Sequence, residues 1–326
     1  MWYLMSSTVH PEASAAEEPH PEITALLQEM GAAPMPTFWS LSPDGARAFM
    51  RELFPVADDP EPVGAVMELS VTDRDVPVRV YVPDGDGPYP TLVYFHGGGW
   101  VLGDLELYDA TCRALTNAAD CMVVSVDYRL APEHPFPTPL EDCYAAAEWV
   151  FDTAAAMQVD TDNVAVGGDS AGGNLAAAVA QMARDRDGPS FARQLLIYPV
   201  TDHSFDTESY EANAEGYLLT RADMRWFWDH YLRNDTDGRN PYASPLQARS
   251  LAGLPPATVV TCGFDPLRDE GAAYASRLAE DGVTVNHVHY PDAIHGIAQM
   301  LVEPVAVDRA RDLVDDVGGD LAAAFD

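Results

Sequence analysis

The sequence predicts an α/β protein built around a mostly parallel β-sheet. Short apolar runs that fit buried strands alternate with helix-like segments; the runs cover residues 91–95, 122–126, 163–167, 194–200, 257–261 and 283–290. Two earlier runs, 66–71 and 76–82, alternate between apolar and polar residues, as an antiparallel start to the sheet would. A chain of 326 residues is long enough for one such domain with an added element.

The segments outside this alternation predict the rest of the organisation. Residues 1–20 are rich in Pro, Glu, His and Ala, and we expect a mobile tail there. Residues 21–55 contain two helix-like stretches, one beginning at Pro21 and one at Ser42-Pro43. From 201 to 253 the alternation of strand and helix breaks down, and aromatic residues accumulate. Both segments can be ordinary packing elements, or they can cover a site formed elsewhere in the chain.

The charge balance excludes several kinds of partner. The chain has 52 acidic and 18 basic residues, a formal net charge of -34, and every one of its cations is an arginine. Nucleic acids and anionic membranes would be repelled by such a surface. The acidic residues are spread along the chain, which argues against a disordered acidic arm. The composition instead fits a folded protein from a salt-accumulating, halophile-like cytoplasm, because at 1 M salt the Debye length is only about 3 Å.

Neither targeting nor metal binding is indicated. No apolar run is long enough to span a bilayer, and the apolar start at residues 1–5 lacks the basic leader of a signal peptide. We therefore expect a cytoplasmic protein. The four cysteines show no Cys-x-x-Cys spacing, so reduced, mostly buried thiols are expected rather than a zinc site or a redox pair.

The most informative motif is segment 168–174, which reads Gly-Asp-Ser-Ala-Gly-Gly-Asn and lies between a strand-like and a helix-like run. This context is typical of a nucleophile elbow, in which a sharp turn holds a serine hydroxyl where a base can reach it. The turn strains the serine backbone and leaves no room for side chains at 168 and 172. Ser170 is therefore the candidate nucleophile. A glycine-rich turn can also bind phosphate or only pack tightly, but the strand–helix context favours catalysis.

A second glycine-rich segment, 96–100, reads His-Gly-Gly-Gly-Trp and follows the strand-like run 91–95. Consecutive glycines expose backbone N–H groups, and those of Gly98 and Gly99, joined by Ala171, can form an oxyanion hole. His96 and Gly97 are expected to support this loop, His96 through a structural hydrogen bond. The spacing does not match a P-loop, and the chain has no lysine, so that alternative is excluded.

A nucleophilic serine needs a histidine as base and a carboxylate to orient it. Asp265 follows the strand-like run 257–261, and His295 comes a few residues after the run 283–290. The order serine, acid, histidine is that of hydrolases with a nucleophile elbow. Ser170, Asp265 and His295 are therefore the predicted catalytic residues.

Other residues compete less well for these roles. Asp269 and Glu270 fall inside the next helix, and Asp292 belongs to the same loop as the catalytic histidine, where a turn-forming role is expected. His287 and His289 lie on one face of a strand, but no carboxylate or cysteine accompanies them at a spacing suited to a metal. We therefore expect no metal site.

Taken together, these motifs resemble those of the hormone-sensitive lipase family of α/β-hydrolases, the bacterial and archaeal family IV carboxylesterases. The resemblance runs from about residue 21 to the C-terminal helix and includes the oxyanion motif at 96–100, the nucleophile motif at 168–174, the acid motif at 265–270 and the histidine motif at 295–296. The proline-dense loop at 128–137 is also typical. Ile297 stands where the family usually carries Phe, which concerns packing beside the histidine.

The resemblance implies an α/β-hydrolase fold with an eight-stranded, mostly parallel sheet flanked by helices. It implies a core made of residues 56–200 and 254–326, and a helical cap made of the N-terminal helices at 21–55 and the insertion at 201–253. No cofactor is implied. A homodimer through the edge of the last strand is compatible with the fold.

The implied function is that of a serine carboxylesterase, which hydrolyses small-molecule esters of short- to medium-chain acids through an acyl-enzyme intermediate. An amidase or deacetylase would use the same triad, so the sequence does not separate these activities. A non-catalytic ligand receptor on this fold is a different class. Such a receptor would have lost the histidine, whereas His295 is present.

Overall fold

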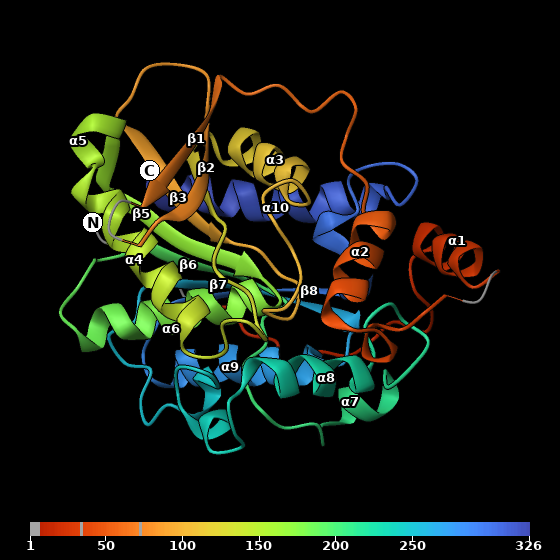
Figure 1. Cartoon of the computed structure of the whole chain (residues 1–326). Coiled ribbons are helices and arrows are strands. Elements are labelled where there is room, and N and C mark those ends of the chain that lie inside the picture. The colour runs from red at the N-terminus through yellow and green to blue at the C-terminus, as the bar shows by residue number, and fades with distance from the viewer. Residues whose placement is uncertain (1–6, 33–34, 72–73) are drawn as a thin grey trace.

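The computed structural model describes residues 7–32, 35–71 and 74–326. At its centre lies an eight-stranded sheet in the order β1-β2-β4-β3-β5-β6-β7-β8, which confirms the predicted fold class (Figure 1). The pairs β1–β2 and β2–β4 are antiparallel, and the other pairs are parallel. The strands are β1(Ala65–Val71), β2(Val76–Val82), β3(Tyr89–Phe95), β4(Met122–Val126), β5(Val159–Asp169), β6(Arg193–Ile197), β7(Ala257–Phe264) and β8(Val285–Ile294).

Burial along the strands follows their place in the sheet. Every residue of β4, β6 and β7 is buried, because helices cover both faces of the parallel part and its strands carry continuous apolar runs. In β1, at the sheet's edge, only Val71 is buried. The last strand runs to Ile294, beyond the predicted end at 290, so His295 follows directly at the strand's C-terminal end.

Five helices flank the sheet. In Figure 1, α3(Asp109–Ala119) and α10(Asp308–Phe325) lie together on one face, and α4(Thr138–Asp152), α6(Ala171–Asp185) and α9(Arg268–Glu280) lie on the other. The helix α4 ends where the chain leaves helical geometry at Thr153, before the short α5(Ala154–Met157).

The segments at 21–55 and 201–253 contact each other. The first holds α1(Pro21–Met30), η1(Phe38–Ser40) and α2(Pro43–Leu53); the second holds α7(Glu208–Ala212), α8(Arg221–Tyr231), η2(Asp237–Arg239) and η3(Pro245–Gln247). The backbone N–H of Trp39 donates to Asp223 at 2.9 Å, and the Phe38 and Phe227 rings are 5.9 Å apart. The Arg47 guanidinium joins α2 to the loop after β4 through two hydrogen bonds to Glu133, at 2.7 and 2.8 Å.

Residues 7–20 lie along the outer edge of β8, so the prediction of a mobile tail is wrong for this part. Thr8 forms a parallel bridge with Asn286, and the backbone N–H of Ala16 donates to the carbonyl oxygen of Pro291 at 2.8 Å. The composition did not reveal this because the segment satisfies the free hydrogen-bonding groups of an edge strand rather than forming an element of its own. The same contacts occupy the edge through which a homodimer was expected.

Two further expectations concern the chain as a whole. In the part of the chain that the structure describes, no helix has the length and apolar character needed to cross a bilayer. Residues 1–5, for which the sequence predicts no targeting role, lie outside the described residues. The thiols Cys112, Cys121, Cys143 and Cys262 are unpaired and buried, as predicted.

Candidate active site

The serine of the Gly-x-Ser-x-Gly segment stands at a sharp turn between β5 and α6. Ser170 has φ 55° and ψ -118°, a conformation that L residues rarely adopt and that costs energy to hold. A Cβ atom on Gly168 or Gly172 would run into the backbone carbonyl of Phe95 on β3. Glycine is therefore required at both positions by the neighbouring strand as well as by the turn itself.

The three residues predicted to form a triad lie in hydrogen-bonding contact. Ser170 Oγ is 2.9 Å from His295 Nε2, and His295 Nδ1 is 2.8 Å from Asp265 Oδ2. Asp265 is fully buried, and its other oxygen accepts the backbone N–H of Leu267 at 2.8 Å. Because the carboxylate accepts from Nδ1–H, the lone pair on Nε2 remains free to take the serine proton.

The competing carboxylates point elsewhere. Glu270 accepts the backbone N–H of Thr201 at 2.6 Å, and Asp269 accepts that of Ser209 at 2.7 Å, so both hold the insertion to α9. Asp292 pairs with Arg309 of α10 at 2.9 Å. The structure thus brings only Asp265, of the four carboxylates considered, to His295.

The glycine loop after β3 faces the serine with free backbone donors. Within the described residues, the N–H groups of Gly98, Gly99 and Ala171 donate to no protein acceptor, and Ala171 begins α6, where the first N–H groups have no intrahelical partner. The N–H of Ser170 donates to the carbonyl of Ile197 at 2.8 Å and is therefore engaged. The three predicted donors can bind an oxyanion together with the positive end of the helix dipole.

His96, at the start of this loop, is held by a hydrogen bond and a ring contact. Its Nδ1 is 2.8 Å from the carbonyl oxygen of Gly97, and its ring stacks on that of Tyr128 with centroids 4.3 Å apart. Complete burial lowers the pKa of His96 to about 4, so the ring is neutral at pH 7 and donates through Nδ1–H. The Tyr128 hydroxyl donates to the His96 carbonyl at 2.7 Å, which ties the loop to the segment after β4.

Asp169, which was given no role from the sequence, links the serine turn to the glycine loop. Its Oδ1 accepts the backbone N–H of Gly97 at 2.9 Å and the Tyr94 hydroxyl at 2.8 Å, and its Oδ2 accepts the Tyr108 hydroxyl at 3.2 Å. Burial raises the pKa of Asp169 to about 6, against the opposing effect of these hydrogen bonds. The only sequence signal was an acidic residue at the end of a buried strand, directly before the nucleophile.

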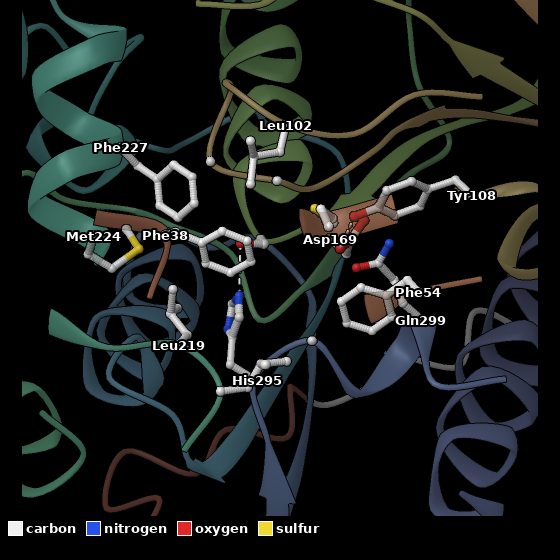
Figure 2. Close-up of a pocket in the computed structure, with 16 residues that line it drawn as sticks. Phe38, Phe54, Leu102, Tyr108, Asp169, Leu219, Met224, Phe227, His295 and Gln299 are labelled. Atoms are coloured by element: carbon white, nitrogen blue, oxygen red, sulfur yellow. Dashed lines mark hydrogen bonds between the residues drawn. The ribbon is translucent and has the colours of Figure 1, made fainter. Parts of the chain in front are cut away.

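A mostly apolar pocket opens beside the serine, with a cavity volume of about 60 Å³. In Figure 2, Phe227, Met224 and Leu219 lie on one side of His295, and Phe54 and Gln299 lie on the other. Both the N-terminal segment and the 201–253 insertion thus contribute to the wall. The lining residues are Phe38, Met50, Phe54, Gly98, Gly99, Leu102, Tyr108, Asp169, Ser170, Leu218, Leu219, Met224, Phe227, His295, Gly296 and Gln299.

His287 and His289, the pair weighed as a metal site, are held by hydrogen bonds instead. The Thr261 hydroxyl lies 2.8 Å from His287 Nε2 and 2.9 Å from His289 Nδ1. The remaining ring nitrogens contact the backbone N–H of His10 at 3.1 Å and the carbonyl of Ser14 at 2.8 Å. These histidines therefore fasten residues 7–20 to β8. Among the described residues, no group of three or more His, Cys, Asp or Glu side chains is arranged to hold a metal ion.

Comparison with known proteins agrees with this geometry. A family model described as alpha/beta hydrolase fold matches residues 92–299, which span the glycine loop, the serine turn and His295. An α/β hydrolase from the metagenome of Lake Arreo superposes with a TM-score of 0.89 at 41% identity, covering 95% of this chain and 99% of that one. The fold and the site thus define an α/β hydrolase.

Among α/β hydrolases, the similar proteins include ester hydrolases. The carboxylic ester hydrolase LipN of Mycobacterium tuberculosis is 45% identical over 263 residues, which is 78% of this chain and 70% of the relative. An arylesterase of Saccharolobus solfataricus is 39% identical over 266 residues, 81% of this chain and 87% of the relative. The chain belongs to the α/β-hydrolase family, in its hormone-sensitive lipase group of family IV carboxylesterases, and is a serine hydrolase of carboxylic esters.

Proposed function

We propose that Ser170, His295 and Asp265 carry out ester hydrolysis in this protein. The hydrogen-bonded chain from Ser170 Oγ through the imidazole to the buried carboxylate is the observation that supports this assignment most directly. Gly98, Gly99 and Ala171 supply the oxyanion hole, and His96 and Gly97 support the loop that carries two of the three donors.

The reaction follows from this arrangement in two halves. Ser170 Oγ attacks the ester carbonyl while its proton passes to Nε2 of His295, and the three N–H groups bind the oxyanion. As the tetrahedral intermediate collapses, the bond from the carbonyl carbon to the alkoxy oxygen breaks and Nε2 returns the proton to the departing alcohol. Water then repeats these steps on the acyl-serine, which releases the carboxylic acid and restores the serine.

We propose short- to medium-chain acyl esters as the substrates. The cavity beside the serine, about 60 Å³, is smaller than the roughly 150 Å³ cavity that admits benzene in an engineered protein core. Its apolar wall suits an alkyl chain and binds it by burial of surface. These features favour the short end of the range, since a longer chain would have to displace side chains such as Phe227 or Met224.

The cellular setting is also part of the proposal. An excess of 34 acidic over basic residues on a folded chain supports a cytoplasm rich in salt, where repulsion between like charges is screened. A homodimer would have to use another surface or displace residues 7–20 from the edge of β8.

The function is tested with p-nitrophenyl acetate, butyrate, octanoate and palmitate in molar salt, with Ser170→Ala as the matched inactive control. We expect turnover of the acetate and butyrate, weak turnover of the palmitate, and none by the variant. Equal activity of the variant would exclude the serine as nucleophile. Faster turnover of p-nitroacetanilide than of the acetate would favour the amidase alternative. Failure of a fluorophosphonate to label Ser170 would favour the receptor.

A further inference from the structure

Gln299 stands out among the side chains of the pocket because its terminal amide has no bonding partner there. The side chain is 9% exposed, its Nε2 is shielded from solvent, and it contacts no acceptor among the described residues. Figure 2 shows the amide on the same side of the pocket as Phe54, Tyr108 and Asp169.

The other polar side chains of the pocket wall are engaged with one another. Tyr108 donates to Asp169 at 3.2 Å, and Ser170 contacts His295 at 2.9 Å. An amide N–H that is shielded from water and left unbonded destabilises the folded protein. A ligand that brings an acceptor into the pocket would remove this penalty, and among the described side chains of the wall Gln299 is the one whose donor has no acceptor.

The position of Gln299 is fixed by the same turn that follows the catalytic histidine. It ends η4(Ile297–Gln299), directly after Gly296. The backbone N–H of Ala298 donates to the Tyr198 hydroxyl at 3.3 Å, and the carbonyl of Ala298 accepts the Thr111 hydroxyl at 3.2 Å. These contacts hold the turn to Tyr198, directly after β6, and to α3, so the backbone that carries the amide keeps a constant position relative to the reacting serine.

The surroundings also limit which acceptor fits. The described residues that line the pocket include no arginine, so a carboxylate on the substrate would find no cation to pair with. It would also be repelled by Asp169, which lies on the same side as Gln299. A neutral oxygen meets no such penalty, and it can accept from the amide while the rest of the substrate contacts the apolar wall.

We propose that Gln299 is a specificity-determining residue that donates a hydrogen bond to a neutral ether, hydroxyl or carbonyl oxygen in the acyl or alcohol part of the ester. The preferred substrates are then oxygenated esters rather than plain alkyl esters. The inference rests on the proposed function, since it concerns the pocket beside Ser170.

Two pairs of esters of equal size test it. In the acyl part, p-nitrophenyl methoxyacetate replaces one methylene of the butyrate by oxygen; in the alcohol part, 2-methoxyethyl acetate does the same for butyl acetate. The ratio of kcat/KM within each pair is compared between the wild-type protein and Gln299→Leu, which cancels the intrinsic reactivity of the esters. Met224→Leu, on the opposite wall, is the matched control.

We expect Gln299→Leu to lower the ratio by about 3- to 10-fold in one of the two pairs, which corresponds to one neutral hydrogen bond. That pair also tells which part of the ester reaches the amide. Met224→Leu should leave both ratios unchanged. Ratios unchanged by Gln299→Leu in both pairs would overturn the inference.

Two measurements separate this inference from the proposed function and from misfolding. Turnover of the butyrate by Gln299→Leu shows that the fold and triad are intact, and Gln299→Met replaces it if the leucine variant is unstable. A wild-type protein that turns over neither member of either pair contradicts the proposed function, and the inference fails with it.

Discussion

Replacing Asp169 by asparagine separates two effects of this buried carboxylate. Its Oδ1 accepts from Gly97 and Tyr94, so an asparagine must keep its carbonyl oxygen there, because its NH₂ group would meet two donors. The NH₂ group then takes the place of Oδ2 and faces the Tyr108 hydroxyl, which can rotate to accept. Asp169→Asn thus keeps the geometry, removes the charge and weakens the hydrogen bond to Gly97.

The effect on stability depends on pH. Burial raises the pKa of Asp169 from 3.8 to about 6, so between these values the folded protein binds a proton that the unfolded chain has released. The ionised carboxylate therefore costs the folded state up to about 3 kcal/mol above pH 6. The free energy of unfolding of Asp169→Asn, relative to the wild-type protein, should rise by up to about 3 kcal/mol from pH 4 to pH 7. Urea unfolding at the two pH values measures it.

The effect on activity has the opposite direction. Gly97 precedes the two glycines that we propose as oxyanion donors, and loss of one such donor typically lowers kcat by about 10² to 10³. A weaker hydrogen bond to Gly97 should displace these donors from their positions without removing them. We therefore expect kcat to fall by about 10- to 100-fold with little change in KM. The variant should thus have a lower kcat than the wild-type protein at a pH where it is at least as stable.

The matched control is Asp109→Asn, a buried carboxylate outside the pocket that accepts from Tyr81 at 2.9 Å and Arg113 at 2.6 Å. It should lose stability at pH 7 and keep its kcat. A stability difference for Asp169→Asn that is the same at pH 4 and pH 7 would refute the argument from burial. An unchanged kcat would refute the link between Asp169 and the glycine loop.

Three further predictions rest on other features. With a net charge of -34, the protein should melt at a higher temperature in molar potassium chloride than in dilute buffer, and an unchanged Tm would contradict the halophilic assignment. Burial lowers the pKa of His287 to about 4, so the stability that the neutral ring supplies above about pH 6.5 should be lost as the pH falls toward 4. Over this range the free energy of unfolding of the wild-type protein should fall by up to about 3 kcal/mol more than that of His287→Gln. Equal falls in the two proteins would contradict the prediction. Gly99 has φ +60°, and a Cβ there would strike the Phe227 ring, so Gly99→Ala should lower kcat/KM by about 10²-fold or more. The control is Gly319→Ala, which adds a methyl group in open space on α10 and should leave kcat/KM unchanged. Equal kcat/KM values for the two variants would contradict the prediction.

The local parts of the site were predictable from the sequence because they are encoded by adjacent residues. The glycines around Ser170 and the three glycines after His96 reflect backbone positions where no side chain fits, and each can be recognised within seven residues. The strands were found for a similar reason, since burial on both faces requires continuous apolar runs.

Contacts between distant segments could not be read in this way. The residues near positions 7–20 in the sequence do not indicate that this segment covers the edge of β8, because its partners lie more than 250 positions away. The same holds for the contact between Asp169 and Gly97 and for the unbonded amide of Gln299. Each depends on which side chains the packed helices and strands bring together.

The fold class could be predicted from the sequence and is confirmed by the structure, and the nucleophile, the oxyanion donors and the order of the triad are predictions from the same source, because steric demands and burial act residue by residue along the chain. Packing of distant segments selects Asp265, rather than Asp269, Glu270 or Asp292, as the partner of His295, and it places Asp169 between the serine turn and the glycine loop. The physical reason is that hydrogen-bond partners are selected by distances of about 3 Å in the packed molecule, and these are fixed only when the whole sheet and its helices are in place.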